Sequence, residues 1–249
     1  MQKELQSGPF LWIDALPPQR RDADYDRLRR GEVITDRLQT LDQGHIITVP
    51  DGLIHHWIGV VFIPGASLEQ TIRFLQDYDN QYKSYAPEVQ RSKLLSRNGN
   101  DFRVYLQLRK KKVVTVVLNT DYDVHYAIVD RFRAVARSYS TRLAELENPG
   151  QKDEREKPVG DDSGFMWRLD SYWRFWEKDG GTFVQLEAIS LTRDIPSGLG
   201  WLVRPFITSI PQESLAFTLS HTRKALSDRA GGGIVGPEHG VKGAEKPAS

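Results

Sequence analysis

Residues 194–226 read DIPSGLGWLVRPFITSIPQESLAFTLSHTRKAL, and this stretch decides the fold. A break rich in proline and glycine turns the chain at its start. We expect a short apolar helix over residues 199–208 and then a second, longer helix. The second helix should begin at Ser209, whose hydroxyl can accept a hydrogen bond from the amide of Gln212 in a capping box. Pro211 fits this assignment, because first-turn amides have no acceptor within the helix.

The second helix carries one apolar stripe. Leu215, Leu219 and Leu226 recur at helical spacing, with Thr222 between them, so they lie on one face. Most of the chain before residue 194 has the alternation typical of β-strands, so the stripe needs a sheet to cover it. We therefore predict an α+β fold in which a curved antiparallel β-sheet wraps around a long C-terminal α-helix. The function is expected to lie in the gap between them.

Composition is that of a soluble globular protein and excludes several functions. The 249 residues are 39% hydrophobic with a mean hydropathy of -0.50, and a chain of this length can bury a substantial core. The formal net charge of +1 creates no long-range field toward nucleic acid, and no apolar run is long enough for stable insertion into a membrane. The chain contains no cysteine, which excludes disulfides and thiolate chemistry. No cofactor is predicted, and the oligomeric state stays open.

The chain divides into an arm, a main domain and a tail. Residues 1–48 are expected to form an N-terminal arm, with an extra strand, that packs on the domain formed by residues 49–228. Residues 229–249 lack apolar periodicity and are predicted to be a disordered tail. The polar N-terminus lacks the apolar segment of a secretion signal. The default expectation is a cytoplasmic protein, and the alternative is a periplasmic or secreted one from which a signal peptide was removed.

Strands and helices within these parts are assigned from residue preferences and turn signals. We expect an arm helix over residues 24–30 that is closed by Gly31, and a second helix that begins at a capping box of Ser67 and Gln70. The lysine run at residues 110–112 is interpreted as a solvated hairpin tip, with an anion site as the alternative. The expected strands are residues 33–41, 53–63, 89–97, 102–109, 113–120, 124–129, 132–145, 165–177 and 182–192.

The last hairpin can be aligned residue by residue. Asp179-Gly180 is typical of a type I′ turn between two strands, and this turn sets their register. Because side chains alternate along a strand, one face is then apolar and the other is mixed or charged. The predicted apolar pairs are Phe175 with Val184, Trp173 with Leu186, Ser171 with Ala188, and Leu169 with Ser190; the other face pairs Trp176 with Phe183, Arg174 with Gln185, Tyr172 with Glu187, and Asp170 with Ile189.

The side chains on the apolar face of this hairpin become smaller along its length. It is bulky near the turn, at Trp173. At the far end it is small, because Ser171, Ala188 and Ser190 lie there. Small residues opposite a helix either let the helix approach closely or leave a void. Both outcomes stay open on the sequence alone.

Several short motifs follow one another in a recognisable order. They are His56-Trp57-Ile58-Gly59-Val60, Trp167-Arg168-Leu169, Tyr172-Trp173-Arg174-Phe175, Asp179-Gly180-Gly181-Thr182 and Ile195-Pro196. Over residues 53–226 this order resembles the START-like (SRPBCC) helix-grip superfamily, which includes polyketide cyclase/dehydrase-like proteins and coenzyme-Q-binding START domains. The resemblance implies a deep apolar cavity between sheet and helix, used in that superfamily for lipids, sterols, quinones or polyketides. The N-terminal arm departs from the minimal domain.

The resemblance also implies which side chains line such a cavity. A pocket of this kind is mostly apolar, with a few polar groups that orient the ligand. The ligand-binding residues that we expect are Trp57, Leu106, Trp167, Leu169, Ser171, Trp173, Leu186, Ala188, Ser190, Val203, Phe206, Leu215 and Leu219. Phe217 lies off the helix stripe, and we expect the arm around Phe10 and Trp12 to cover it.

Catalytic and metal-binding motifs are scarce. His55 and His56 are adjacent on a strand and point to opposite faces, and the other histidines lack partners at ligand spacing, so no metal site is predicted. The hairpin register assigns Glu187 to the outer face. With the opposite register it would be buried, with a raised pKa, and would become an acid/base candidate. Ser220 and His221 are consecutive helix residues and do not face each other.

These observations favour a protein that binds or carries a hydrophobic small molecule of the lipid, quinone, sterol or polyketide class, with no catalysis required. The alternative is a cyclase- or hydrolase-like enzyme that uses a buried carboxylate or histidine in the same cavity as an acid/base. A third hypothesis is a filled core with a structural or protein-binding role. Whether the protein is an enzyme depends on whether a buried, unpaired acid or base lies beside the void.

Overall fold

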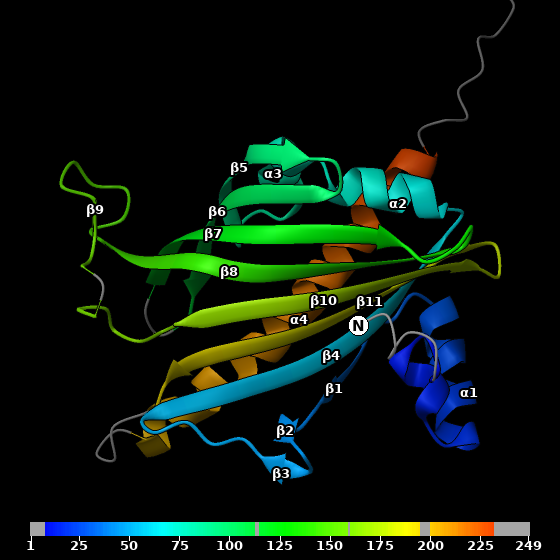
Figure 1. Ribbon diagram of the computed structural model, residues 1–249, viewed down its shortest axis with the longest axis horizontal. Helices are drawn as coiled ribbons and strands as arrows, with labels where there is room; N and C mark the ends of the chain where they lie inside the picture. Colours follow the sequence, from blue (N-terminus) through cyan, green and yellow to red (C-terminus); the bar gives the residue numbers. More distant parts are fainter. Residues whose placement is uncertain (1–7, 113–114, 159, 195–199, 232–249) are drawn as a thin grey trace, which may run out of the picture.

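The structure is a computed structural model that describes residues 8–112, 115–158, 160–194 and 200–231; for residues 200–208 and 229–231 it describes the backbone alone. In this part of the chain one large curved sheet carries a long helix on its inner face and the N-terminal arm on its outer face (Figure 1). The predicted α+β fold is therefore confirmed. No helix among the described residues has the length and apolar character needed to cross a membrane.

The sheet has the strand order β1-β4-β11-β10-β8-β7-β6-β5, with antiparallel neighbours throughout and the short strand β9 added to β8. Strand β4 pairs with β11, which brings the first long strand beside the last one. The bounds are β1 Ile34–Arg37, β2 Leu41–Asp42, β3 His45–Ile46, β4 Gly52–Pro64, β5 Val89–Asn98, β6 Asp101–Lys111, β7 Thr115–Ile128, β8 Arg133–Glu147, β9 Arg155–Glu156, β10 Arg168–Lys178 and β11 Gly181–Arg193. Strands β2 and β3 form a separate hairpin.

Helix α4 (Gly200–Gly231) runs unbroken behind the sheet (Figure 1). The prediction of two helices with a capping box at Ser209 is wrong. The Gln212 side chain donates to Thr35 Oγ1 on β1 at 3.1 Å, and the Ser209 hydroxyl interacts with Glu213 one turn later. A proline inside a helix removes one backbone hydrogen bond, and contacts with the sheet outweigh that local stop signal at Pro211. The helix extends into the predicted tail of residues 229–249, and residues 232–249 lie outside the described part of the chain.

The N-terminal arm forms η1 (Trp12–Ala15) and α1 (Pro18–Arg29). Helix α1 begins earlier than the predicted residues 24–30, because proline is well suited to the first helical position. Gly31 closes it as expected, with φ +94°.

The arm packs on the outer face of the sheet. Its side chains Phe10, Leu11 and Ile13 are buried against Phe62 and Phe183. The backbone amide of Trp12 also donates to Gln185 Oε1 at 2.6 Å. The prediction that the arm covers Phe217 is therefore wrong, since Phe217 packs against the core on the opposite face. The outer face of the last hairpin carries apolar side chains of its own, and these need the cover that the arm supplies.

The predicted register of the last hairpin is confirmed at every pair. Asp179 and Gly180 have φ +58° and +75°, as a type I′ turn requires. The capping box of Ser67 and Gln70 is also confirmed: it opens α2 (Leu68–Leu75), which is followed by η2 (Tyr78–Asn80) and α3 (Gln81–Ser84).

Within the described residues, the predicted strands at residues 113–120 and 124–129 correspond to one strand, β7. Residues 113–114 lie outside the described part of the chain. The acidic residues Asp121 and Asp123 do not break β7, because they pair with Arg142 and Arg103 on the neighbouring strands. A register shift against β8 after Asp121 adjusts the pairing there. Polar residues that look like a turn in the sequence thus belong to the outer face of a continuous strand.

Candidate ligand-binding cavity

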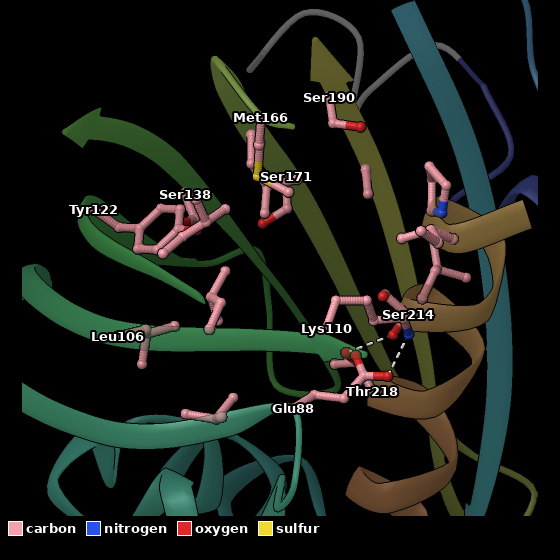
Figure 2. Close-up of a pocket in the computed structure, with 18 of the residues that line it drawn as sticks. Glu88, Leu106, Lys110, Tyr122, Ser138, Met166, Ser171, Ser190, Ser214 and Thr218 are labelled. Atoms are coloured by element: carbon pink, nitrogen blue, oxygen red, sulfur yellow. Dashed lines mark hydrogen bonds and ion pairs between the residues drawn. The ribbon is translucent and has the colours of Figure 1, made fainter. Parts of the chain in front are cut away.

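A cavity of about 560 Å³ lies between α4 and strands β5 to β8, β10 and β11. Its wall comes from alternate residues of these strands, from the segment around α2 and α3, and from residues 210–218 of α4 (Figure 2). Binding sites for small molecules usually have volumes of ~300–1,000 Å³. The cavity is therefore large enough for one small molecule.

The cavity exists because α4 packs closely against only part of the sheet. A Cβ atom placed on Gly59 of β4 would lie 2.5 Å from Leu215 Cδ2 and 2.8 Å from Leu219 Cδ1, so glycine lets the helix approach there. On β10 and β11 the side chains that face the helix include Ser171 and Ala188, which are too small to fill the space. Both outcomes that the sequence left open for small residues therefore occur, on neighbouring strands.

The wall toward α2 and α3 is aromatic and uncharged. The hydroxyls of Tyr78 and Tyr126 lie 2.9 Å apart, and those of Tyr85 and Thr222 lie 2.8 Å apart. Burial raises the pKa of all three tyrosines well above its ordinary value, so they stay protonated near neutral pH. This wall offers apolar surface and hydroxyls that already have partners.

Charged groups gather where β5 and β6 approach α4 (Figure 2). Lys110 Nζ lies 2.5 Å from Glu88 Oε1 at the cavity wall, and Lys112 Nζ lies 2.6 Å from Glu213 Oε2 on α4. The hydrogen bond from Lys112 holds the pKa of Glu213 below its ordinary value. Lys111 and Lys112 are exposed, as the interpretation of the lysine run as a solvated tip predicted, whereas Lys110 is partly buried. The acidic partners of Lys110 and Lys112 come from distant parts of the chain.

A row of hydroxyls crosses the inner face of the sheet inside the cavity. It consists of Ser138 on β8, Ser171 on β10 and Ser190 on β11, with Tyr122 of β7 beside Ser138 (Figure 2). Ser138 and Ser171 are directly opposite each other in the sheet. Among the described residues these hydroxyls have no hydrogen-bond partner. We call this set the hydroxyl row.

Tyr122 remains a protonated donor. Burial is the main reason that its pKa is raised to about 12, and the charge of Asp170 adds to the rise. The nearby Thr120 hydroxyl donates to the carbonyl oxygen of Leu106 at 2.7 Å, and Tyr122 Oη has no hydrogen-bond partner among the described residues.

The arrangement of sheet and helix has counterparts among known structures. The sequence matches no protein-family model and no curated protein. The Zhui aromatase/cyclase from Streptomyces sp. R1128 is similar in structure with a TM-score of 0.53 at 14% identity, over 73% of this chain and 100% of that chain. The protein has the START-like helix-grip fold.

Two further solved structures are similar at lower scores. A STAR-related lipid transfer protein from Xanthomonas axonopodis gives a TM-score of 0.47 at 17% identity, over 75% of this chain and 98% of that one. A protein from Thermus thermophilus gives 0.49 at 19% identity, over 69% and 97%. At these identities the similarity shows the fold alone, so function has to be argued from the residues of the cavity.

The side chains predicted to bind a ligand fall into three groups in the START-like fold. Three predicted residues do not line the cavity: Trp57 and Leu219 pack in the core, and Trp167 Nε1 donates to Asp162 Oδ1 at 3.1 Å. Val203 and Phe206 belong to the part of α4 whose side chains lie outside the described residues. Contact with a ligand remains a prediction for every one of them. The predicted residues that line the cavity are Leu106, Leu169, Ser171, Trp173, Leu186, Ala188, Ser190 and Leu215.

Sequence reasoning missed most of the wall formed by β6 to β8. A signal was present, because apolar residues alternate through β7 and thereby mark its inner face. Using that signal requires the strand order, which shows that Ser138 lies opposite Ser171 and that β7 lies beside β8. The missed lining residues of β6 to β8 are Val104, Leu108, Arg109, Lys110, Val116, Leu118, Tyr122, Val124, Tyr126 and Ser138.

Glu187 and the histidines of the described part of the chain do not line the cavity. His55 points to the inner face, where its Nε2 lies 3.1 Å from Thr192 Oγ1, and burial lowers its pKa. His56 points to the outer face, with Nε2 2.9 Å from Glu187 Oε1 and Nδ1 3.1 Å from Thr40 Oγ1. Glu187 therefore lies on the outer face, as the register predicted, and is not a cavity acid. The described residues contain no cluster of three side chains suited to a metal ion.

Proposed function

We propose that the protein binds and carries a hydrophobic small molecule in the cavity between the sheet and α4. The observation that carries this proposal is a cavity of about 560 Å³ with a wall of mainly apolar side chains. Removing apolar surface from water contributes ~25 cal/mol per Å², so an apolar molecule of matching size gains its affinity from this wall. The presence of the cavity counts against the hypothesis in which a filled core has a purely structural role.

The alternative function is an enzyme of the cyclase type, because the Zhui protein, which shares the fold, is named an aromatase/cyclase. Proton transfer needs a side chain within hydrogen-bond reach of the reacting group. No histidine is among the described residues that line the cavity, and the lining carboxylates, Glu88 and Asp194, stand at strand ends. Glu88 is also paired with Lys110. These features favour binding and carriage over catalysis.

The proposal is tested by native mass spectrometry of the purified protein, combined with extraction of bound lipids and titration with a fluorescent apolar probe. We expect a retained apolar molecule, or uptake of the probe by the apo protein. Ser171→Phe places a ring in the cavity and should abolish probe uptake. Ser96→Phe makes the same change at an exposed position of β5 and should leave uptake unaltered. An apo mass with no probe uptake would refute the proposal.

A further inference from the structure

The hydroxyl row has no structural role that the protein itself explains. Ser190 and Tyr122 are only 6% and 5% exposed, and both line the cavity. Buried polar groups in proteins nearly always have hydrogen-bond partners, and a buried group without one costs free energy. In the hydroxyl row Tyr122 Oη is such a buried group, and the three serine hydroxyls face the cavity without a protein partner among the described residues, so a polar partner is expected inside the cavity.

Several other hydroxyls in or beside the same cavity have hydrogen-bond partners. Tyr78 pairs with Tyr126, Tyr85 pairs with Thr222, and the Thr218 hydroxyl donates to the carbonyl oxygen of Ser214 at 2.9 Å. The fold therefore does supply partners within this wall where hydroxyls serve its own stability. The hydroxyl row differs from them, and it lies on the inner face of β7, β8, β10 and β11, where the helix leaves the sheet uncovered.

The spacing of the hydroxyl row follows from the sheet. Ser138 and Ser171 are directly opposite, so their Cβ atoms are separated by about 5 Å. Ser190 is diagonal to Ser171, because Ser171 pairs with Ala188 two residues away, and diagonal neighbours lie roughly 7–8 Å apart. A molecule that satisfies the row therefore needs more than one polar atom along the same edge.

The charge of those polar atoms also follows from the surroundings. Serine and tyrosine hydroxyls both donate and accept hydrogen bonds and carry no charge. The cationic residues that line the cavity, Arg109, Lys110 and Arg193, are at the ends of β6 and β11. Lys110 is paired with Glu88 (Figure 2), and the Arg193 guanidinium lies over the Trp167 ring. The hydroxyls of the row carry no charge, so they would not neutralise a carboxylate or phosphate buried beside them, which is unfavourable.

We propose that the ligand is a neutral molecule with an apolar skeleton and at least two oxygen functions, carbonyl or hydroxyl, held by the hydroxyl row. This inference rests on the proposed function and narrows its ligand class. A plain hydrocarbon or acyl chain fills the cavity without satisfying the row. A multiply oxygenated ring or chain fills the cavity and satisfies the row at the same time.

The test uses a matched pair of probes, naphthalene and 1,3-dihydroxynaphthalene, which share a skeleton and differ by two oxygens. Their dissociation constants are measured by calorimetry with the wild-type protein and with Ser138→Ala, Ser171→Ala and Ser190→Ala. A net hydrogen bond is worth about 0.5–1.5 kcal/mol, so each substitution should weaken binding of the diol about 2- to 10-fold. Binding of naphthalene should stay within about 2-fold, because its skeleton makes no hydrogen bond. Ser220→Ala, on the exposed face of α4, is the control and should change neither constant.

A second readout separates ligand recognition from a structural role. Because the serine hydroxyls of the row have no partner, Ser171→Ala should leave the melting temperature of the apo protein unchanged or slightly higher. Thr182→Val removes a buried hydroxyl that donates to the carbonyl oxygen of Ala66 at 2.7 Å, and it should lower the melting temperature. A lower melting temperature for Ser171→Ala would count against the inference.

The outcomes distinguish the inference from the proposed function. If wild-type protein binds both probes and the serine substitutions leave the diol unaffected or weaken both probes alike, the inference is overturned while the carrier function stands. If neither probe binds to the wild-type protein, the proposed function fails and the inference fails with it. Selective loss of diol binding supports both.

Discussion

The two sides of α4 use small residues for opposite purposes. On β4, Gly59 brings the helix so close that a single added carbon would overlap with Leu215 and Leu219. On β10 and β11, Ser171 and Ala188 are also small, yet the helix does not approach them and a cavity of about 560 Å³ remains. The first side is a packed seam, and the second is a binding site.

The difference shows what decides between contact and void. A helix is a rigid rod, so close approach along one strand determines its distance from the neighbouring strands of a twisted sheet. The ion pair of Lys112 with Glu213 and the hydrogen bond of Tyr85 with Thr222 hold the far side of α4 at a distance. Small residues under a helix that is held on both sides leave an empty space.

The largest expected effect belongs to the packed seam. Leu219 is fully buried, so Leu219→Ala should lower the free energy of unfolding by about 2–5 kcal/mol through lost contacts and a new void. Leu106→Ala, a matched change at the cavity wall, should cost less than half as much, because that side chain already borders empty space. Urea denaturation measures both. Equal losses would contradict the distinction between seam and cavity.

The next effect comes from adding atoms instead of removing them. Gly59→Ala should lower the free energy of unfolding by about 1–3 kcal/mol, because the new methyl overlaps with both leucines and approaches the carbonyl oxygen of Ile34 to 3.2 Å. Ala188→Val adds two carbons toward the cavity and should change stability by less than about 1 kcal/mol. Thermal and urea unfolding test the pair. An unchanged free energy of unfolding for Gly59→Ala would contradict close packing of α4 against β4.

A smaller effect concerns the pH dependence of stability that His55 causes. This residue is on β4, directly opposite Ser190 of β11. Burial lowers the pKa of His55, and the charge of Arg37 lowers it further, so the folded protein favours the neutral ring. The stabilising contribution is complete above the ordinary value of 6.5 and is lost as pH falls from there through the lowered pKa. The slope from one such group is at most about 1.4 kcal/mol per pH unit.

Urea unfolding of the wild type and of His55→Asn between about pH 5 and pH 8 measures this contribution. The variant lacks a titrating ring, so its stability should fall less steeply toward acid pH. Identical pH profiles for the two proteins would rule out a role for His55 in acid sensitivity.

The smallest effect is expected at the ion pair that joins the β6–β7 hairpin to α4. Lys112→Met should lower the free energy of unfolding by no more than about 1 kcal/mol, because both partners are partly exposed. The pKa of Glu213 is lowered by Lys112, so the stabilisation is present above the ordinary value of 4.5 and is lost as pH falls through the lowered pKa. The difference from the wild type should shrink at acid pH and in high salt, as thermal melts can show. If the stability difference between Lys112→Met and the wild type persists in about 1 M salt, Lys112 stabilises the protein by packing and not by its charge.

The sequence was sufficient wherever local rules specify the structure. The turn at Asp179-Gly180 determined every pair of the last hairpin, and the Ser67 capping box determined the start of α2. The decrease in side-chain size along the hairpin toward Ser171 and Ala188 marked the place where the cavity lies. These features depend on residues that are close in the chain, or on a strand register that a single turn determines.

The errors arose where distant segments meet. The capping box expected at Ser209 did not form, because Gln212 reaches Thr35 on another element. The partners of the lysine run were not foreseen, because Glu88 and Glu213 come from elsewhere in the chain. The half of the cavity wall built by β6 to β8 was missed, because the strand order that brings Ser138 to Ser171 is a property of the whole sheet.

By itself, the sequence determined that an antiparallel sheet holds a terminal helix and which face of the last hairpin turns inward. Alternation, turn chemistry and helical spacing encode these features locally. Only the tertiary structure decided that the helix touches β4 and stands away from β10, and that the hydroxyl row has no partners within the described part of the protein. The distance between two packed elements is a balance of contacts from many parts of the chain, and no short stretch of residues contains it.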